Sequence, residues 1–294
     1  MPVTPLITLP DTAWVAGAGA PTHAVERQLE AGAVLCLPDL RFALRDAERR
    51  FLDPRWGDGK AKNISLRTNG ELRGASGTPE EQTELHAMVA RYRDQATALA
   101  ERLFPHYVGK LRLGNTSYRP VAVEGRETSW RKDDTRLHVD AFPSNPTHGT
   151  RLLRVFHNLN PVGKPRVWRV GQEFEPFAKH FLPRIKAPFP GSAAVLRALH
   201  VTKSLRTPYD HYMLGLHDEG KADLGWQRDC EQATVEFSPG TTWIVFSDQV
   251  LHAVMGGQFM MEQTFYLDAA DQLQPETSPL RVLERLLARP LVAA

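Results

Sequence analysis

Residues 135–161 read TRLHVDAFPSNPTHGTRLLRVFHNLNP, and the pattern of this stretch indicates the type of fold. An apolar alternation stops at His138 and Asp140, a turn-rich segment of Pro, Asn and Gly follows, and an apolar run containing Arg154 comes next. This order is typical of a barrel strand that ends at the barrel mouth, a turn, and a second strand. Side chains at such a strand end can converge on a site, so His138 and Asp140 are candidate metal ligands.

The His-x-Asp spacing alone does not identify a metal site. The chain of 294 residues has 11 histidines and 34 acidic residues, and its two His-x-acid triplets are about what chance gives. The second triplet, His217-Asp-Glu219, lies where Tyr212 and Leu216 recur at helical spacing, so we interpret it as a solvated helix face. Context therefore favours the first triplet.

A third ligand is expected from a later strand. In PGTTWIVFSDQVLHAVMGG, a predicted strand over 241–246 precedes a turn, and His252 opens the next strand. Two imidazoles and one carboxylate form the facial triad of non-heme Fe(II) oxygenases. His138, Asp140 and a distant His252 match the order of such a site in a double-stranded β-helix. The other histidines, including His157, are predicted to lie on the surface or in helices.

The rest of the pattern predicts a mainly β fold with flanking helices. Short β-rich runs separated by Pro and Gly extend over about 105–270, while 174–225 looks helical. We therefore expect a double-stranded β-helix core, jelly-roll or cupin-like, with N-terminal α/β support and inserted helices. The length of the chain is compatible with a single domain over 1–294.

Two further helices are predicted outside this core. Thr78, Pro79 and Glu81 form the signature of a capping box that begins a helix reaching about Phe104. The segment 278–290 predicts a short amphipathic helix. Its apolar side carries Leu280, Leu283 and Leu287. We expect this helix to pack on the core in preference to a membrane surface, because it is short and has no aromatic anchor.

Composition indicates a cytoplasmic protein that binds a small anion. The chain is 42% hydrophobic and 24% charged, as in ordinary globular proteins, and its start lacks the basic region of a secretory signal. Net charge is only +2, but residues 110–169 hold 12 Lys or Arg against 5 Asp or Glu. No basic arm, RNA-recognition signature or zinc-finger spacing occurs, so nucleic acid is not an expected partner.

Three segments together resemble one enzyme family. They are SYRPVAVEGRETSWR from Ser117, DDTRLHVDAFPSNPTHGTRLLRVFHNLNP from Asp133, and VFSDQVLHAVMGGQFMMEQTFYLD from Val245. They are similar to the Kdo hydroxylases, bacterial Fe(II)/2-oxoglutarate-dependent dioxygenases. The resemblance covers about residues 110–270 in its motifs.

The resemblance implies a substrate, a cofactor and two co-substrates. The substrate would be 3-deoxy-D-manno-oct-2-ulosonic acid (Kdo) in Kdo-containing lipid A, hydroxylated at C3 to Ko during lipopolysaccharide biosynthesis. The enzyme would work at the cytoplasmic face of the inner membrane, with peripheral membrane contact. His138, Asp140 and His252 would bind Fe(II) and act catalytically, with 2-oxoglutarate and O2 as co-substrates and succinate as co-product.

The distal carboxylate of 2-oxoglutarate needs a cation, and many relatives supply one about ten residues after the distal histidine. Here no Lys or Arg lies between His252 and Leu267. Arg154, fourteen residues after Asp140, resembles the alternative arrangement and is preferred over Arg151, which alternation assigns to the opposite strand face. Thr264 is a second candidate for binding the co-substrate.

Flanking residues supply candidates for the substrate. We expect basic side chains around the iron motif to bind the sugar carboxylate and phosphates: Arg126, Arg131, Lys132 and Arg136. Tyr118 and Trp130 are candidates for stacking on the sugar. Two alternatives stay open, namely an oxygenase of the same class acting on another acidic small molecule, and a non-catalytic barrel that binds anionic glycolipid.

Overall fold

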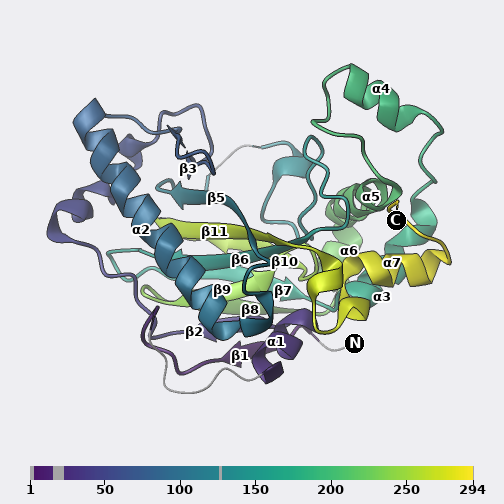
Figure 1. The fold of residues 1–294 in the computed structure, drawn as a ribbon, viewed down its shortest axis with the longest axis horizontal. Coiled ribbons are helices and arrows are strands. Elements are labelled where there is room, and N and C mark those ends of the chain that lie inside the picture. Colours follow the sequence, from purple (N-terminus) through teal and green to yellow (C-terminus); the bar gives the residue numbers. More distant parts are fainter. Residues whose placement is uncertain (1–2, 16–22, 126–127, 294) are drawn as a thin grey trace.

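The computed structural model describes residues 3–15, 23–125 and 128–293 (Figure 1). Within them lie two sheets of eight and three strands. The large sheet has the order β1 (Leu6–Thr8), β2 (Val34–Leu37), β9 (Thr242–Phe246), β6 (Arg151–Asn158), β11 (Met260–Leu267), β5 (Arg112–Arg119), β3 (Ile64–Leu66) and β4 (Leu72–Arg73). The small sheet has the order β10 (His252–Gly256), β7 (Arg166–Gly171) and β8 (Gln232–Phe237). The fold is the predicted double-stranded β-helix, mainly β with flanking helices.

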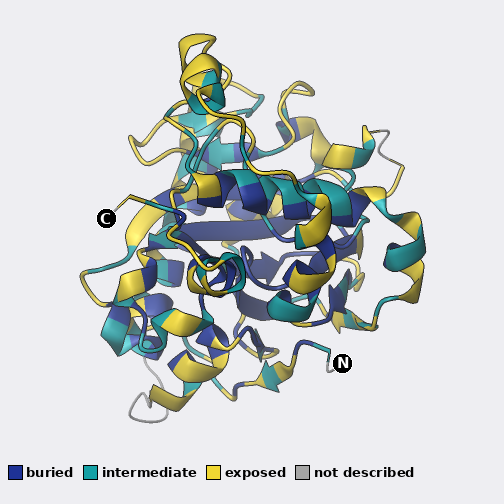
Figure 2. Ribbon diagram, turned by 90° about the vertical axis from the view of Figure 1, so that its right-hand side faces the viewer, coloured by how far each residue is buried: buried dark blue, intermediate teal, exposed yellow. Residues whose placement is uncertain are grey.

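Seven α-helices surround the sheets in the described part of the chain. They are α1 (His23–Glu30), α2 (Pro79–Leu103), α3 (Phe174–Phe181), α4 (Ser192–Ala198), α5 (Pro208–Ala222), α6 (Leu224–Asp229) and α7 (Pro279–Leu287). Figure 2 shows that the strands are largely buried and that exposed residues gather on the outer faces of helices and on loops. No helix in the described ranges is long and apolar enough to cross a bilayer.

Strand alternation separates two hydrophobic cores. In β6, Leu153 and Val155 belong to the core under α2, whereas Phe156 faces the space between the two sheets. Between the sheets Phe156 packs against Trp168 of β7 and Trp243 of β9, with ring centroids 5.2 and 5.3 Å apart. This inter-sheet side also holds the polar side chains of the site, because residues two apart on a strand share a face.

The long helix α2 forms as its sequence predicts. Thr78 Oγ1 accepts a hydrogen bond from the Glu81 amide at 3.3 Å, and the Glu81 carboxylate accepts one from the Thr78 amide at 2.9 Å. Its buried stripe packs on the large sheet, where the Tyr92 hydroxyl donates to the Val155 carbonyl at 2.9 Å. The helix thus supports the strand that carries Arg154.

A third core holds the helices inserted after β7 together with α7. Phe177, Phe181 and Met213 pack there with Leu280 and Leu283. The prediction that the C-terminal helix packs on the core is confirmed, since its apolar side is covered.

Tyr118, a candidate for stacking on the sugar, is instead fully buried in the core, as aromatic side chains of strands more often are, and its hydroxyl donates to the Phe51 carbonyl at 2.7 Å. The prediction for His157 is wrong. Its ring is buried in β6, with one nitrogen accepting from the Phe42 amide at 3.3 Å and the other 2.9 Å from the Thr242 hydroxyl.

Candidate metal centre

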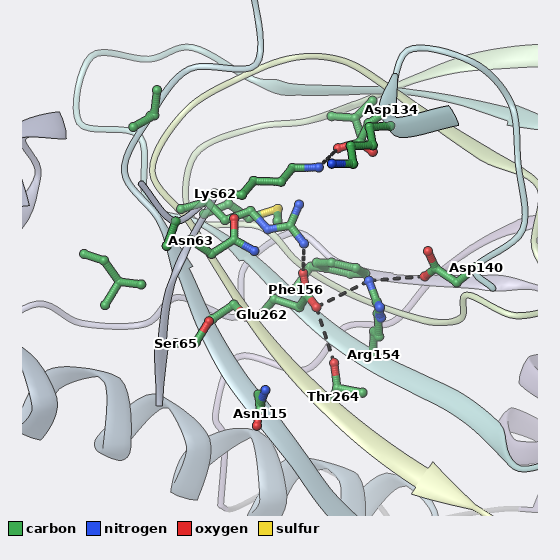
Figure 3. Close-up of a pocket in the computed structure, with 18 of the residues that line it drawn as sticks. Lys62, Asn63, Ser65, Asn115, Asp134, Asp140, Arg154, Phe156, Glu262 and Thr264 are labelled. Carbon is green, nitrogen blue, oxygen red and sulfur yellow. Dashed lines mark hydrogen bonds and ion pairs between the residues drawn. The ribbon is translucent and has the colours of Figure 1, made fainter. Parts of the chain in front are cut away.

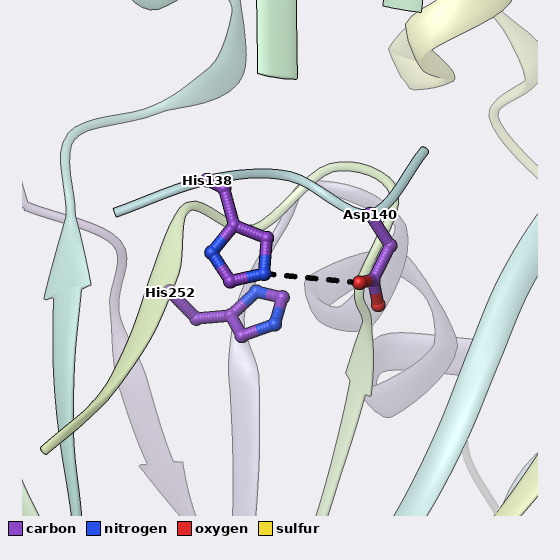
Figure 4. Close-up of side chains that lie close together, drawn as sticks. All are labelled: His138, Asp140 and His252. Atoms are coloured by element: carbon purple, nitrogen blue, oxygen red, sulfur yellow. Dashed lines mark ion pairs between the residues drawn. The ribbon is translucent and has the colours of Figure 1, made fainter. Parts of the chain in front are cut away.

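His138, Asp140 and His252 come together in the structure, and one ligand atom from each lies within 4.8 Å of the others (Figure 4). The segment before Asp140 is not a regular strand. A single antiparallel bridge joins His138 to His252, with N–H···O distances of 3.0 and 2.9 Å. The Asp140 amide then donates to the Ser247 carbonyl at 2.8 Å. These bonds fix the three backbones relative to one another.

Both imidazoles are oriented by their own loop or strand. His138 Nδ1 lies 2.7 Å from the Arg136 carbonyl, and His252 Nδ1 lies 2.9 Å from the Val250 carbonyl. A carbonyl oxygen only accepts, so each Nδ1 must carry the proton, which leaves each Nε2 with a free lone pair. Trp168 stacks on His252 with ring centroids 5.0 Å apart.

The protonation states suit metal binding. Burial lowers the pKa of His138, as do the neighbouring His252 and Lys221. Burial likewise lowers the pKa of His252. For Asp140, burial favours the neutral acid, but the Arg154 guanidinium outweighs it and holds the carboxyl pKa below its usual range. Two neutral imidazoles and one carboxylate are the ligand states that a divalent metal requires.

The donor set fits a divalent transition metal. Asp140 Oδ2 is a buried oxygen without a hydrogen bond in the structure, although Arg154 Nη1 lies 3.2 Å away as an ion pair. His138 Nε2 and Asp140 Oδ1 approach within 3.9 Å. Two free imidazole nitrogens and a carboxylate on one side leave the cavity side open for further ligands, as in the facial triad.

The triad opens into a cavity of about 930 Å³, whose lining residues come from segments between Pro54 and Tyr266. Among the described residues its walls carry three acidic side chains, Asp134, Asp140 and Glu262. They also carry eight basic ones: Lys60, Lys62, Arg119, Arg131, Lys132, Arg154, Arg166 and Lys221. This surplus of positive charge attracts anionic ligands.

Arg154 is the central cation of this cavity (Figure 3). Its Nη1 lies 3.2 Å from Asp140 and 3.3 Å from Glu262 Oε1, and Glu262 also pairs with Arg119. Burial favours neutral Glu262, but Arg119 and Arg154 outweigh it and lower its pKa. Thr264 lies opposite Arg154 in the β6–β11 register, and its hydroxyl is 3.3 Å from Glu262 Oε1.

Only some of the predicted substrate-binding residues lie in the cavity wall that the structure describes. Arg131 and Lys132 line the cavity, and Arg131 also pairs with Asp218 at 3.0 Å. Arg136 instead bonds Asp133 and donates to the Lys221 carbonyl at 2.8 Å, away from the described cavity lining. Arg126 lies outside the described residues.

Two other predicted positions lie outside the cavity lining as the structure describes it. Trp130 stacks under the Arg131 guanidinium at 4.1 Å. Arg151, the alternative to Arg154, is fully buried and bonds Asp248 at 2.7 Å and Gln249 at 2.6 Å.

Several cavity residues were missed at the level of sequence. His217 was expected on a solvated helix face, but that prediction is wrong. The residue is buried on α5, lines the cavity, and meets the His138 ring edge-on at 5.4 Å. Lys62 and Glu262 also line the cavity, and neither belongs to a recognisable sequence motif. In the structure Lys62 pairs with Asp134. For Glu262, the alternation that placed Thr264 was a usable signal, because the two residues share one face of β11.

Comparison with known proteins agrees with this geometry. A family model described as 3-deoxy-D-manno-oct-2-ulosonic acid (Kdo) hydroxylase matches residues 15–290. A structure of the Kdo hydroxylase KdoO, a non-heme Fe(II) α-ketoglutarate-dependent dioxygenase, with α-ketoglutarate and Fe(III) is 46% identical, with 98% of each chain covered and a TM-score of 0.93. No curated protein sequence matches the chain.

Two further structures of KdoO are similar to the same extent. The complex with cobalt(II) is 47% identical, with 99% of this chain and 98% of that chain covered and a TM-score of 0.94. The complex with succinate and Fe(III) is 46% identical, with 99% and 98% covered and a TM-score of 0.93. α-Ketoglutarate is 2-oxoglutarate, so these relatives hold a metal, the co-substrate and its product.

Proposed function

Because this chain belongs to the Kdo hydroxylase family and is an Fe(II)/2-oxoglutarate-dependent dioxygenase, we propose that it hydroxylates Kdo at C3 to give Ko. The acceptor in this proposal is Kdo-containing lipid A, met at the cytoplasmic face of the inner membrane. The observation that carries the proposal is the His138, Asp140 and His252 cluster in the wall of a large, basic cavity.

The triad residues have one role each in the proposed metal site. His138 and His252 would donate Nε2, because each Nδ1 is held by a backbone carbonyl. Asp140 would supply a carboxylate oxygen and neutralise part of the metal charge. Iron bound there supplies the activation of O2 and the oxidative decarboxylation of 2-oxoglutarate to succinate that drive C–H hydroxylation.

Arg154 would bind the distal carboxylate of 2-oxoglutarate. It lies within ion-pair distance of Asp140, and its side chain is largely buried, where a charged hydrogen bond is strong. Thr264, across the β6–β11 pair, would add a hydroxyl. Glu262 shares Arg154 with the incoming carboxylate, so we expect it to orient the guanidinium without contacting the metal.

The outer cavity would bind the anionic sugar. Arg131, Lys132, His217 and Lys221 line the cavity, and Lys221 donates to the Arg131 carbonyl at 3.1 Å. Lys62 joins them from the segment before β3. The volume of about 930 Å³ is at the upper end of ligand sites, which run to roughly 1,000 Å³, so it has room for a co-substrate and a sugar together. The basic side chains and the volume of the cavity support an acidic sugar as the substrate.

The test is turnover on purified Kdo-containing lipid A and on free Kdo, with Fe(II), 2-oxoglutarate and O2. We expect one added oxygen on the sugar and one succinate per hydroxylated product, with faster turnover of the lipid-linked acceptor. His138→Ala should abolish both products. Exclusive turnover of free Kdo would contradict the lipid-linked acceptor. Glycolipid binding without succinate in wild type would instead favour a non-catalytic barrel.

A further inference from the structure

Residues 184–206, here called the α4 arm, expose an unusual share of apolar surface. Thirteen large hydrophobic side chains are exposed in the described residues, and five of them lie within 189–205. These five are Phe189, Val195, Leu199, Val201 and Leu205. Phe189 is 82% exposed and Leu199 is 68% exposed. Clustered exposed apolar residues on a soluble fold mark an interaction surface.

The charge of the arm restricts the partner. The segment contains five basic residues and no Asp or Glu. Only Arg184 among them has an ion pair in the described structure, to Asp223 at 2.7 Å. Lys186, Arg197 and Lys203 are exposed. Apolar side chains mixed with basic ones, without acids, complement a surface that is both apolar and anionic, which is the character of a phospholipid bilayer.

The arm lies apart from the sheets and beside the site. In Figure 1, α4 projects beyond α5 at the upper edge of the fold. The C-terminal end of the arm is hydrogen-bonded to the loop that follows Asp140. The Lys203 amide donates to the Ser144 carbonyl at 3.0 Å, and Arg206 donates to the Pro143 carbonyl at 2.8 Å. Phe142 on that loop lines the cavity. A surface bound by the arm would therefore lie near the loop that carries a wall of the cavity.

The C-terminal helix does not compete for this role. Leu280 and Leu283 of α7 are buried in the helical core, so its apolar side is not available to a membrane. Its arginines are paired on the protein itself, Arg281 with Glu284 at 2.6 Å and Arg285 with Glu175 at 2.7 Å. The cluster of five exposed apolar side chains lies on α4 and its flanks.

We propose that the α4 arm docks this protein on an anionic phospholipid bilayer, with Phe189 and Leu199 entering the interface and the basic side chains contacting lipid phosphates. This inference adds to the proposed function a surface for the membrane contact, and it would explain how the enzyme reaches a lipid-linked sugar. Its test therefore uses vesicles without any Kdo lipid, so that docking is measured apart from turnover.

The experiment is flotation of the full-length protein with vesicles of phosphatidylcholine alone or mixed with phosphatidylglycerol. We expect flotation with the mixed vesicles, weakened by salt, and little with phosphatidylcholine alone. The double variant Phe189→Ser/Leu199→Ser should lower the partition coefficient about tenfold or more. The matched control is Val162→Ser/Leu224→Ser, which replaces side chains of similar exposure outside the arm and should float like wild type.

A charge variant and an activity assay complete the test. Arg197→Gln/Lys203→Gln should reduce the preference for phosphatidylglycerol, because it removes two basic side chains from the arm. Both arm variants should turn over detergent-dispersed substrate like wild type, whereas substrate embedded in vesicles should react more slowly. If the enzyme proved inactive on every Kdo acceptor, flotation would still decide the docking proposal.

Two results would overturn the docking proposal. One is flotation that is equal for wild type and the Phe189→Ser/Leu199→Ser variant. The other is a wild-type dimer in sedimentation velocity that this variant dissociates, with no vesicle binding by either protein. The second result would assign the arm to a contact between two copies of the chain.

Discussion

At the scale of single residues, the orientation of two imidazoles is the feature that makes the candidate metal centre specific. Each Nδ1 donates to the backbone carbonyl two residues earlier in the sequence. The acceptor is Arg136 for His138 and Val250 for His252. The free Nε2 atoms then converge on the candidate metal position, because the two histidines belong to backbone segments joined by an antiparallel bridge. Ring orientation is thereby set by backbone hydrogen bonds, which makes the site preorganised for metal.

Arg154 gives the first prediction. Arg154→Ala should raise the KM for 2-oxoglutarate by about tenfold to a hundredfold, because a charged hydrogen bond contributes roughly 1.5–3 kcal/mol. Steady-state kinetics with varied 2-oxoglutarate measures the change, and Arg154→Lys should fall between wild type and the alanine variant. Arg112→Ala, an exposed arginine paired with Asp268, serves as control. An unchanged KM in Arg154→Ala would exclude this role.

His157 gives a prediction about pH. Burial lowers its pKa to about 3 in the folded protein, against about 6.5 in the unfolded chain. Between pH 6.5 and about pH 3, His157 is therefore protonated in the unfolded state and neutral in the folded state. The free energy of unfolding falls as pH falls through this window. His157→Gln should remove this contribution and flatten the slope of unfolding free energy by about 1.4 kcal/mol per pH unit.

Denaturant unfolding of the metal-free protein between pH 4 and 6 measures this slope. His86→Gln is the control, because His86 is partly exposed on α2 and bonds only the Gly70 carbonyl at 3.0 Å. Parallel pH profiles for wild type and His157→Gln would contradict the assignment.

Sequence patterns failed for these histidines for a physical reason. Helical spacing identified the apolar side of α5 through Tyr212 and Leu216, but it carried no information about what covers the other side. There α5 meets the segment that carries His138, so His217 is buried against the His138 ring. His157 lies on the α2 side of β6, and only tertiary contacts with Phe42 and Thr242 show that its ring is satisfied there.

At the scale of secondary-structure elements, local signals predicted well where local forces decide. The capping box at Thr78 and the apolar stripe placed α2 within a residue of its observed ends. The strand, turn and strand around His252 also formed as predicted. In contrast, the segment around His138 was expected to be a strand. It forms a single β-bridge and a few separate backbone hydrogen bonds, because its neighbours are the ends of β9 and β10.

The C-terminal helix gives an element-scale prediction. Leu283→Ala should lower the free energy of unfolding by about 2–5 kcal/mol, because it leaves a cavity in the core shared by α3, α5 and α7. Chemical denaturation measures this loss, and Val162→Ala, an exposed change outside that core, should stay within about 0.5 kcal/mol of wild type. A membrane-bound α7 would show the opposite pattern, with stability preserved and vesicle binding lost.

At the scale of the whole molecule, the cavity is assembled from segments far apart in the sequence. Lys62 comes from the region of β3, Arg119 from β5, Lys221 from α5 and Glu262 from β11. The order of His138, Asp140 and His252 could be read along the chain because the ligands follow a motif. The remaining walls depend on strand order and helix packing, which no local pattern in this sequence encodes.

The charge of the cavity was also only partly predictable from the sequence. The basic excess in 110–169 predicted an anionic ligand, and that stretch supplies Arg119, Arg131, Lys132, Arg154 and Arg166 to the cavity. Local composition did not reveal that Asp134 and Glu262 would enter among them and pair with Lys62, Arg119 and Arg154. These pairs hold the cations in place before an anion arrives.

The most direct test of the account is anaerobic reconstitution with Fe(II) and 2-oxoglutarate, followed by visible absorption. We predict a weak metal-to-ligand charge-transfer band in wild type that is lost in Asp140→Ala, since the substitution removes one of three ligands. Glu71→Ala, an exposed carboxylate paired with Arg73, is the control and should keep the band. Absence of the band in wild type supplied with iron, or an unchanged band in Asp140→Ala, would contradict the assignment of the metal centre.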